Sequence, residues 1–223
     1  MIDRGLIAAA TKAVESKPRH FVTPAILLAV VLQESHGVPY FTDTKPGSQF
    51  KMNVFGAMSY TKHYRRPDGT KTSTTYQTGL KESDIRRMTT IEKELDKWEV
   101  PAVMAGQLAK FRFEYSYWER YSSLPTEKRF LMSCSWGLAQ FMGPNITKPD
   151  KIDFIRRFRA DVPMQLLYAA GMIDELLERT NGDVNRMYRA YNSGDADSED
   201  LAVLARAKSV ATSAEQIKSQ LGS

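Results

Sequence analysis

The sequence contains a single cysteine, Cys134, and only three histidines. One cysteine cannot form an internal disulfide, so the fold must be stabilised by its hydrophobic core, as expected for a chain that matures in a reducing cytosol. We expect Cys134 to be buried and unreactive. The sequence also lacks the Cys and His spacing of a zinc site, and we therefore expect no bound metal.

Long hydrophobic stretches are missing as well. The longest apolar run spans residues 25–32, far short of the ~20 residues that a membrane-spanning helix needs. It predicts a buried core helix and no membrane insertion. The N-terminus shows no basic start followed by an unbroken apolar stretch and a cleavage site, so we expect no export signal and synthesis in the cytoplasm.

The chain has a net charge of +5, which would attract a polyanion such as a nucleic acid, an anionic lipid or a cell-wall polymer. No DNA- or RNA-binding motif and no regular basic stripe accompanies this charge. We therefore expect no nucleic-acid partner.

Helical spacing of apolar residues dominates, and strands do not alternate with helices as they would in a parallel sheet. The fold is therefore predicted to be mainly α, of the α+β class. The clearest start is Thr23-Pro24, a capping threonine followed by a proline suited to the first helical position. This helix should end near Ser35-His36-Gly37, with the glycine in the left-handed conformation. Further helices are predicted at about 126–132, from residue 163 to Asn181-Gly182, from Asp183 to Tyr191, and at about 199–220.

Residues 38 to about 80 have a different composition, rich in Thr, Tyr and Lys and punctuated by Pro and Gly. The turn sequence Pro67-Asp68-Gly69 separates MSYTKHYRR from TKTSTTYQT, two stretches suited to a small β-hairpin. Helical patterns return after Glu82 and predict two helices, in IRRMTTIEKELDKW and in VPAVMAGQLAKF. The segment FRFEYSYWERY then favours a short strand or extended chain.

Glu34 stands at the end of the apolar helix that begins at Pro24. Cleavage of a glycosidic bond requires a proton for the leaving oxygen, and a carboxylic acid supplies it when its pKa is raised toward the working pH. The helix dipole and partial burial would both disfavour the charged form of Glu34. Glu34 is therefore our candidate general acid, although a surface glutamate at a helix end is also common.

Two later segments have the composition of a sugar-binding groove. SWGLAQFMG combines glycines, which permit close backbone approach, with Trp136 and Gln140, which are suited to stacking on a sugar and hydrogen-bonding it. MYRAYNSG places Tyr191 and Asn192 at the end of a helix, next to a flexible turn. Either segment alone is also compatible with core packing followed by a loop.

The segments LLAVVLQESHG, WGLAQFMG and AYNSG, in this order, resemble the three signature segments of soluble lytic transglycosylases and goose-type lysozymes. The resemblance implies a lysozyme-like fold in which Glu34 is the general acid and Gln140 lines the glycan groove. It also implies that Tyr191 and Asn192 border the acid. We add Ser35, the residue that follows the acid, to the substrate-binding candidates.

FRFEYSYWERY and SCSWGLAQFMG make the sequence more similar still to the N-acetylmuramidase domain of certain phage endolysins. This resemblance covers residues 25–34 and most of 108–194. It implies one lysozyme-like catalytic domain over residues 1–223, with a large insertion at 38–100 that the family pattern does not explain.

The spacing of the motifs leaves two candidates for the acid. Glu34 lies much further before Gly137 than is usual in transglycosylases and goose-type lysozymes, whereas Glu114 lies close before it. Spacing therefore favours Glu114, while the Glu-Ser-x-Gly ending and the uninterrupted helix favour Glu34. We assign the acid to Glu34, and Glu114 then becomes a second carboxylate or the group that orients water.

The resemblance implies that the substrate is bacterial peptidoglycan, cut at the β-1,4 bond between N-acetylmuramic acid and N-acetylglucosamine. Hydrolysis is our preferred reaction, and the alternatives are a lytic transglycosylase that forms a 1,6-anhydro product and an inactive glycan-binding or structural virion protein. Neither reaction needs a cofactor. A phage enzyme made in the host cytoplasm would act at the cell wall and periplasm, either after holin-dependent release or as part of the virion.

Overall fold

The computed structural model describes residues 2–16, 18–37, 120–145, 154, 157–158 and 161–222, together with the backbone of strands 59–65, 71–77 and 111–113. Most of these residues are helical, which confirms the prediction of a mainly α fold with a small β component. No helix in these ranges combines the length and the apolar character needed to cross a membrane.

The chain divides into two compact units. The first unit joins residues 1–39 to residues 161–223, and the second contains residues 40–160. The second unit includes nearly all of the predicted insertion at 38–100 but continues well beyond it. A single catalytic domain with an insertion at 38–100 stays a prediction.

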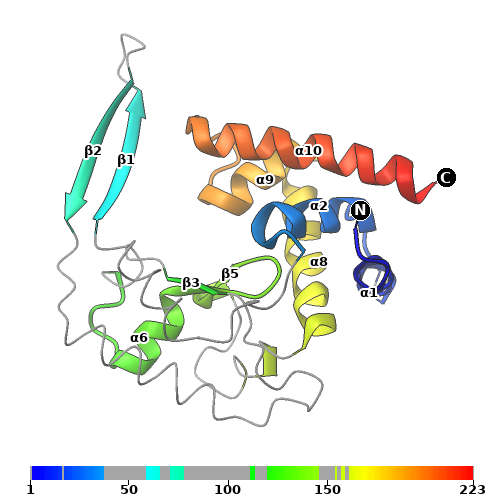
Figure 1. Ribbon diagram of the computed structural model, residues 1–223, viewed down its shortest axis with the longest axis horizontal. Coiled ribbons are helices and arrows are strands. Elements are labelled where there is room, and N and C mark those ends of the chain that lie inside the picture. The colour runs from blue at the N-terminus through cyan, green and yellow to red at the C-terminus, as the bar shows by residue number, and fades with distance from the viewer. Residues whose placement is uncertain are drawn as a thin grey trace. The chain divides into compact units, whose positions relative to one another are not determined.

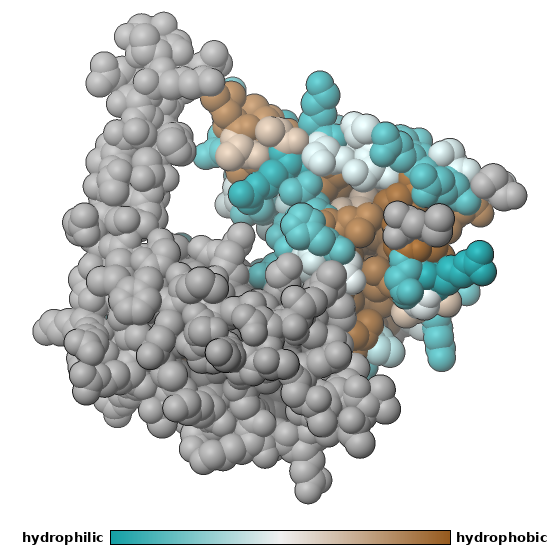
Figure 2. All heavy atoms as spheres, viewed as in Figure 1, coloured by the Kyte–Doolittle hydropathy of each residue, from teal (hydrophilic) through white to brown (hydrophobic). Residues whose placement is uncertain are grey.

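The first unit is a bundle of five helices, and both ends of the chain lie in it (Figure 1). Helix α2 packs against three others, α1, α8 and α10, and α9 packs against α8 and α10. Figure 2 shows hydrophilic side chains along the outward face of α10 and hydrophobic residues in the seam beneath it. The helices are α1 (Arg4–Glu15), α2 (Pro24–Ser35), α8 (Val162–Arg179), α9 (Val184–Ser193) and α10 (Leu201–Leu221).

Helix α2 forms the centre of this bundle because its apolar residues cover its whole circumference. Leu27, Leu28, Val30 and Val31 are each 0% exposed. Burial of a side chain of this size contributes about 1.5–3 kcal/mol, so the four residues anchor the helix firmly. The core helix predicted from the apolar run at 25–32 is confirmed.

Helix α2 begins as predicted, and at its end Gly37 has the predicted left-handed conformation but is not the cap residue. The Thr23 hydroxyl accepts a 3.3 Å hydrogen bond from the backbone N–H of Ile26, and Pro24 occupies the first turn. At the other end, the left-handed cap residue is His36, with φ of 58°, and Gly37 follows with φ of 72°. The helix therefore closes one residue earlier than the glycine alone predicts.

Four of the five helices begin at a capping aspartate: Asp3, Asp161, Asp183 and Asp200. Each carboxylate accepts a hydrogen bond from a free backbone N–H of the first turn, and its negative charge is favourable at that end of the helix dipole. The predicted helices at 163–180, 183–191 and 199–220 are confirmed, with ends shifted by one to two residues. Helix α1 was not predicted.

In the second unit, strands β1 (Ser59–Arg65) and β2 (Lys71–Gln77) form an antiparallel pair in which Arg65 lies opposite Lys71. This pairing confirms the hairpin predicted around residues 67–69. Strands β3 (Phe111–Phe113), β4 (Cys134–Trp136) and β5 (Phe141–Met142) form an antiparallel sheet in the order β3-β4-β5.

The predicted strand in FRFEYSYWERY corresponds to β3, whereas β4 and β5 were not predicted. Helix α6 (Thr126–Met132) has the predicted bounds and is followed by β4, β5 and the 3-10 helix η2 (Gly143–Asn145). Cys134 is buried, as predicted. The two helices predicted after Glu82 lie outside the described residues, except for Phe111 at the end of the second, which begins β3 instead.

Candidate active site

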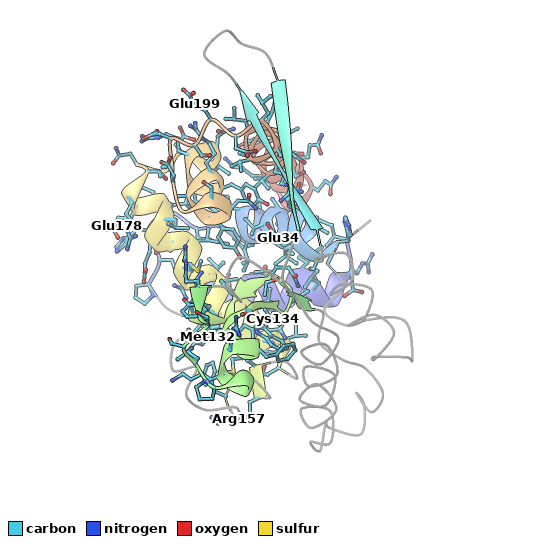
Figure 3. The ribbon with its side chains drawn as sticks, turned by 90° about the vertical axis from the view of Figure 1, so that its left-hand side faces the viewer. Glu34, Met132, Cys134, Arg157, Glu178 and Glu199 are labelled. Carbon is cyan, nitrogen blue, oxygen red and sulfur yellow. The ribbon has the colours of Figure 1, made fainter. Side chains whose placement is uncertain are left out.

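Glu34 lies in the last turn of α2 and is partly buried (Figure 3). The helix ends directly after Ser35, so Glu34 lies at the negative end of its dipole. The side chain is thus held at the end of a rigid, buried helix, with part of its surface accessible.

The hydroxyl of Tyr188 donates a hydrogen bond to Oε1 of Glu34. Tyr188 belongs to α9 and is 0% exposed. Helix α9 begins at the Asp183 cap, whose carboxylate accepts a 3.0 Å hydrogen bond from the backbone N–H of Arg186. The contact therefore joins two elements that are more than 150 residues apart in the sequence.

Tyr191 lies one helical turn after Tyr188, and the two rings stack with centroids 5.9 Å apart and planes at 18°. Burial raises the pKa of the Tyr191 hydroxyl well above its ordinary value, and the charges of Glu34 and Tyr188 raise it further. Tyr191 is therefore an uncharged phenol at neutral pH. The structure brings it next to Glu34, as the resemblance implied.

Asn192 follows Tyr191 in the last turn of α9 and is partly exposed. The helix ends at Gly194, whose φ of 81° closes it in the left-handed conformation. The loop beyond is held to α9, because Arg189 Nε donates a 3.1 Å hydrogen bond to the carbonyl of Ser198. Asn192 therefore occupies a fixed helix end. Its predicted contact with substrate stays a prediction.

Ser35 points in a different direction from the one expected of a substrate contact. It is 0% exposed, and its hydroxyl donates a 3.0 Å hydrogen bond to the carbonyl of Val31 in the same helix. A hydroxyl in this position stabilises the end of α2 beneath Glu34. Its placement does not support the predicted role in substrate binding.

Gln140 lies in the second unit, in the tight turn between β4 and β5, with a left-handed φ of 50°. Its side-chain Nε2 donates a 2.9 Å hydrogen bond to the carbonyl of Gly137, and its Oε1 accepts one of 3.0 Å from the Ser135 hydroxyl. These bonds fix the amide in one orientation. The residue is partly exposed at this turn.

Trp136 is 0% exposed, and its ring packs edge-to-face with that of Phe130, with centroids 6.3 Å apart and planes at 88°. An indole ring must present a face to solvent in order to stack on a sugar. The placement of Trp136 therefore favours a packing role over the predicted stacking role.

Glu114, the second predicted carboxylate, lies outside the described residues. Within the part of the chain that the structure describes, no group of three or more His, Cys, Asp or Glu residues could hold a metal ion. A carboxyl group with a buried tyrosine as its hydrogen-bond donor is suited to acid–base chemistry.

The sequence-based selection missed Tyr188. Tyr188 belongs to the segment MYRAYNSG, which was selected for Tyr191 and Asn192 alone. Residues three apart in a helix lie on the same face, so Tyr188 had to accompany Tyr191 toward any group that Tyr191 approaches. This spacing was the signal that could have identified it.

Comparison with protein families gives a match to the N-acetylmuramidase family over residues 23–194. No curated protein matches the chain, and no solved structure does. The matched range begins at the cap of α2 and ends at the glycine that closes α9, so it contains Glu34, Gln140, Tyr188 and Tyr191. Because the match covers well over half of the sequence, the chain belongs to the N-acetylmuramidase family, whose members are glycoside hydrolases that act on peptidoglycan.

Proposed function

We propose that this protein cleaves the β-1,4 bond that follows N-acetylmuramic acid in peptidoglycan, with Glu34 as the general acid. The observation that carries this proposal is the hydrogen bond from Tyr188 to Glu34, which holds a carboxyl group at the end of a buried helix beside the AYNSG segment. A general acid needs a fixed position relative to the leaving oxygen, and this arrangement provides one.

Two features of the surroundings support the role of Glu34 as an acid. Its partial burial penalises the charged form, and so does its place in the last turn of α2, near the negative end of the helix dipole. Stacking of Tyr191 on Tyr188 adds apolar surface close to the carboxyl group. Proton transfer to the glycosidic oxygen would then leave a carboxylate that accepts the Tyr188 hydrogen bond.

We propose hydrolysis as the reaction, with Glu114 as the second carboxylate, which would orient or activate water. A separation of about 6.5–9.5 Å between the two carboxyl groups would suit an inverting mechanism, and about 5–5.5 Å a retaining one. The alternative is attack by the C6 hydroxyl of the muramic acid, which needs no water. The two reactions give reducing-end and 1,6-anhydro products respectively.

Sugar binding is proposed for Gln140, Tyr191 and Asn192. The Gln140 amide is held by Ser135 and Gly137, and this order lowers the entropy cost of a further hydrogen bond to a sugar. Tyr191 and Asn192 lie at the end of α9, next to the proposed acid.

The experiment is the substitution Glu34→Gln, assayed by the release of reducing ends from purified peptidoglycan. Loss of a general acid lowers the rate by about 10²–10⁴-fold, and we expect a decrease of this size with an unchanged melting temperature. Glu15→Gln, at the exposed end of α1, is the matched control and should retain full activity.

Full activity of the Glu34→Gln variant would exclude Glu34 as the acid. Loss of activity in Glu114→Gln alone would then assign the acid to Glu114. Mass spectrometry of the released muropeptides separates the two reactions, because a 1,6-anhydro product is lighter than a reducing-end product by one water. A wild-type protein that binds peptidoglycan but releases no fragments would contradict both reactions.

For the biological setting, we propose a phage lytic enzyme that is made in the host cytoplasm and acts at the cell wall, released by a holin or carried in the virion. The similarity of FRFEYSYWERY and SCSWGLAQFMG to phage endolysin muramidase domains supports this proposal. Expression in a bacterial host with and without a holin tests it. Lysis that depends on the holin is the result expected of an endolysin.

A further inference from the structure

The proposed acid is held by a tyrosine that the family resemblance does not single out. The hydroxyl that donates to Oε1 of Glu34 belongs to Tyr188, one helical turn before the tyrosine of the AYNSG motif. Tyr188 is fully buried, whereas Tyr191 is partly exposed.

The Tyr188 hydroxyl acts as a hydrogen-bond donor toward Oε1 of Glu34. We propose that Tyr188 is a positioning residue that holds the Glu34 carboxyl group in one orientation and stabilises the carboxylate formed when its proton is transferred. This inference rests on the proposed role of Glu34 as the acid.

The proton balance is simple. The carboxyl proton of Glu34 passes to the glycosidic oxygen as the bond to the sugar breaks, and Glu34 becomes a carboxylate. Tyr188 keeps its own proton throughout and loses nothing. Its hydrogen bond strengthens during the step, because a bond to a charged acceptor is roughly twice as strong as a bond to a neutral one. Tyr188 thus lowers the energy of the transition state more than that of the ground state.

The fold holds Tyr188 in place before any substrate arrives. Its ring is fully buried and stacks on Tyr191. Helix α9 itself is fixed by its Asp183 cap and by packing against α8 and α10. The entropy cost of orienting the donor has therefore been met in folding, which is what distinguishes a preorganised donor from a water molecule.

The hydrogen bond also influences the pH range of activity. A donor on a carboxyl group favours the ionised form, whereas burial and the end of α2 favour the protonated form. Activity that needs a protonated acid falls as the pH rises through the pKa of that acid. Removing the donor should therefore move this alkaline limb of the pH–rate profile to higher pH.

Tyr188→Phe removes the hydroxyl and retains the ring, its burial and its stacking on Tyr191. We expect kcat on purified peptidoglycan to fall about ten-fold or more, the loss expected for one hydrogen bond to a charged group, with little change in KM. The alkaline limb should move upward by about half a pH unit or more. Tyr168→Phe on α8 is the matched control and should change neither kcat nor the limb.

A second variant keeps the test valid if the phenylalanine variant does not fold. Incorporation of 3-fluorotyrosine at position 188 preserves the shape of the side chain and makes the hydroxyl a stronger donor. The alkaline limb should then move to lower pH, opposite to the shift in Tyr188→Phe. A purely structural role for Tyr188 would leave the limb in place in both proteins.

The outcomes separate this inference from the proposed function. If Glu34→Gln retains full activity, the proposed acid is wrong, whatever Tyr188 does. If Glu34→Gln is inactive while the kcat and alkaline limb of Tyr188→Phe equal those of the wild type, only the role of Tyr188 is overturned. The role of Tyr188 is also overturned if fluorotyrosine at position 188 leaves the alkaline limb of the pH–rate profile in place.

Discussion

Oδ1 of Asp174 accepts a 2.9 Å hydrogen bond from the backbone N–H of Val22, two residues before α2 begins. The same oxygen accepts from the backbone N–H groups of Phe21, at 2.9 Å, and His20, at 3.3 Å. One carboxylate on α8 therefore fixes the three consecutive residues that lead into α2. Since Glu34 lies at the far end of that helix, Asp174 helps to set the position of the proposed acid.

Asp174→Ala should destabilise the protein, because it leaves three backbone N–H groups without this acceptor. Hydrogen bonds to a charged group are individually worth about 1.5–3 kcal/mol, but a partly exposed carboxylate is screened by water, so we expect a total near 1 kcal/mol. This corresponds to a decrease in melting temperature of about 2–4 °C for a chain of this length. Glu175→Ala, at the exposed neighbouring position, is the control and should leave the melting temperature within error.

Asp174 should also make stability depend on acidic pH. Burial would raise the pKa of Asp174, but hydrogen bonds from Val22, Phe21 and His20 and the charge of Arg19 outweigh burial and lower it. A lowered pKa in the folded state means that the unfolded state binds the proton first as the pH falls. The stabilisation is therefore fully present above the ordinary carboxyl pKa of about 4 and is lost progressively as the pH falls from there through the lowered pKa of the folded state. Urea unfolding should show that the difference in stability between wild type and Asp174→Ala decreases below about pH 4; a constant difference down to pH 3 would contradict this account.

Tyr191 should have the opposite effect at alkaline pH. Its raised pKa means that the folded state keeps the phenol proton after the unfolded state has lost it, so the stabilisation is present below about pH 10 and is lost above it. Tyr191→Phe has no proton to lose. The variant should therefore lose stability less steeply than the wild type above pH 10, as measured by thermal unfolding across that range. If the stability of both proteins falls equally with pH above pH 10, the pKa of Tyr191 is not raised by folding.

The left-handed end of α2 predicts opposite effects for two neighbouring substitutions. A Cβ on Gly37, which has φ of 72°, would lie 3.2 Å from Leu6 Cδ2 and 3.3 Å from Leu32 Cδ2. Gly37→Ala should therefore lower the free energy of unfolding by about 1–2 kcal/mol, the cost of the left-handed conformation for a residue with a side chain. His36→Gly relieves the same strain at φ of 58° and should stabilise the protein, by less than about 1 kcal/mol because glycine also loosens the unfolded chain. Chemical denaturation should show a lower free energy of unfolding for Gly37→Ala and a higher one for His36→Gly.

Sequence reasoning succeeded where local signals were strong. The Thr23-Pro24 start predicted α2, the turn at 67–69 predicted the hairpin, and the helix at 126–132 was predicted with its observed bounds. Helix α1 was missed although Asp3 caps it and its buried residues Ala10 and Ala13 stand three apart, as on one face of a helix. Strands of two or three residues such as β4 and β5 exist through pairing with their neighbours and leave almost no pattern of their own.

The candidate site likewise combines features that the sequence predicted with features that it did not. The order of the three motifs was enough to place Tyr191 near Glu34, because family resemblance carries information about tertiary arrangement. The direction of a side chain depends on packing, which no local pattern specifies. Ser35 was expected to contact substrate and instead donates to Val31 within its own helix, and Tyr188 was not expected at all.

A substitution of Trp136 tests directly whether its ring packs in the core or stacks on a sugar. Trp136→Leu removes the aromatic face but keeps an apolar side chain, and we expect a loss of about 2–3 kcal/mol in unfolding free energy from the cavity that remains. The KM for peptidoglycan should not change at temperatures where the variant is folded, because the ring is fully buried against Phe130. Phe130→Leu, on the other side of the same contact, is the matched control, and it should show the same combination of lower stability and unchanged KM. If Trp136→Leu instead raises KM several-fold while Phe130→Leu does not, the indole must reach the substrate, and the stacking role predicted from the sequence would be restored.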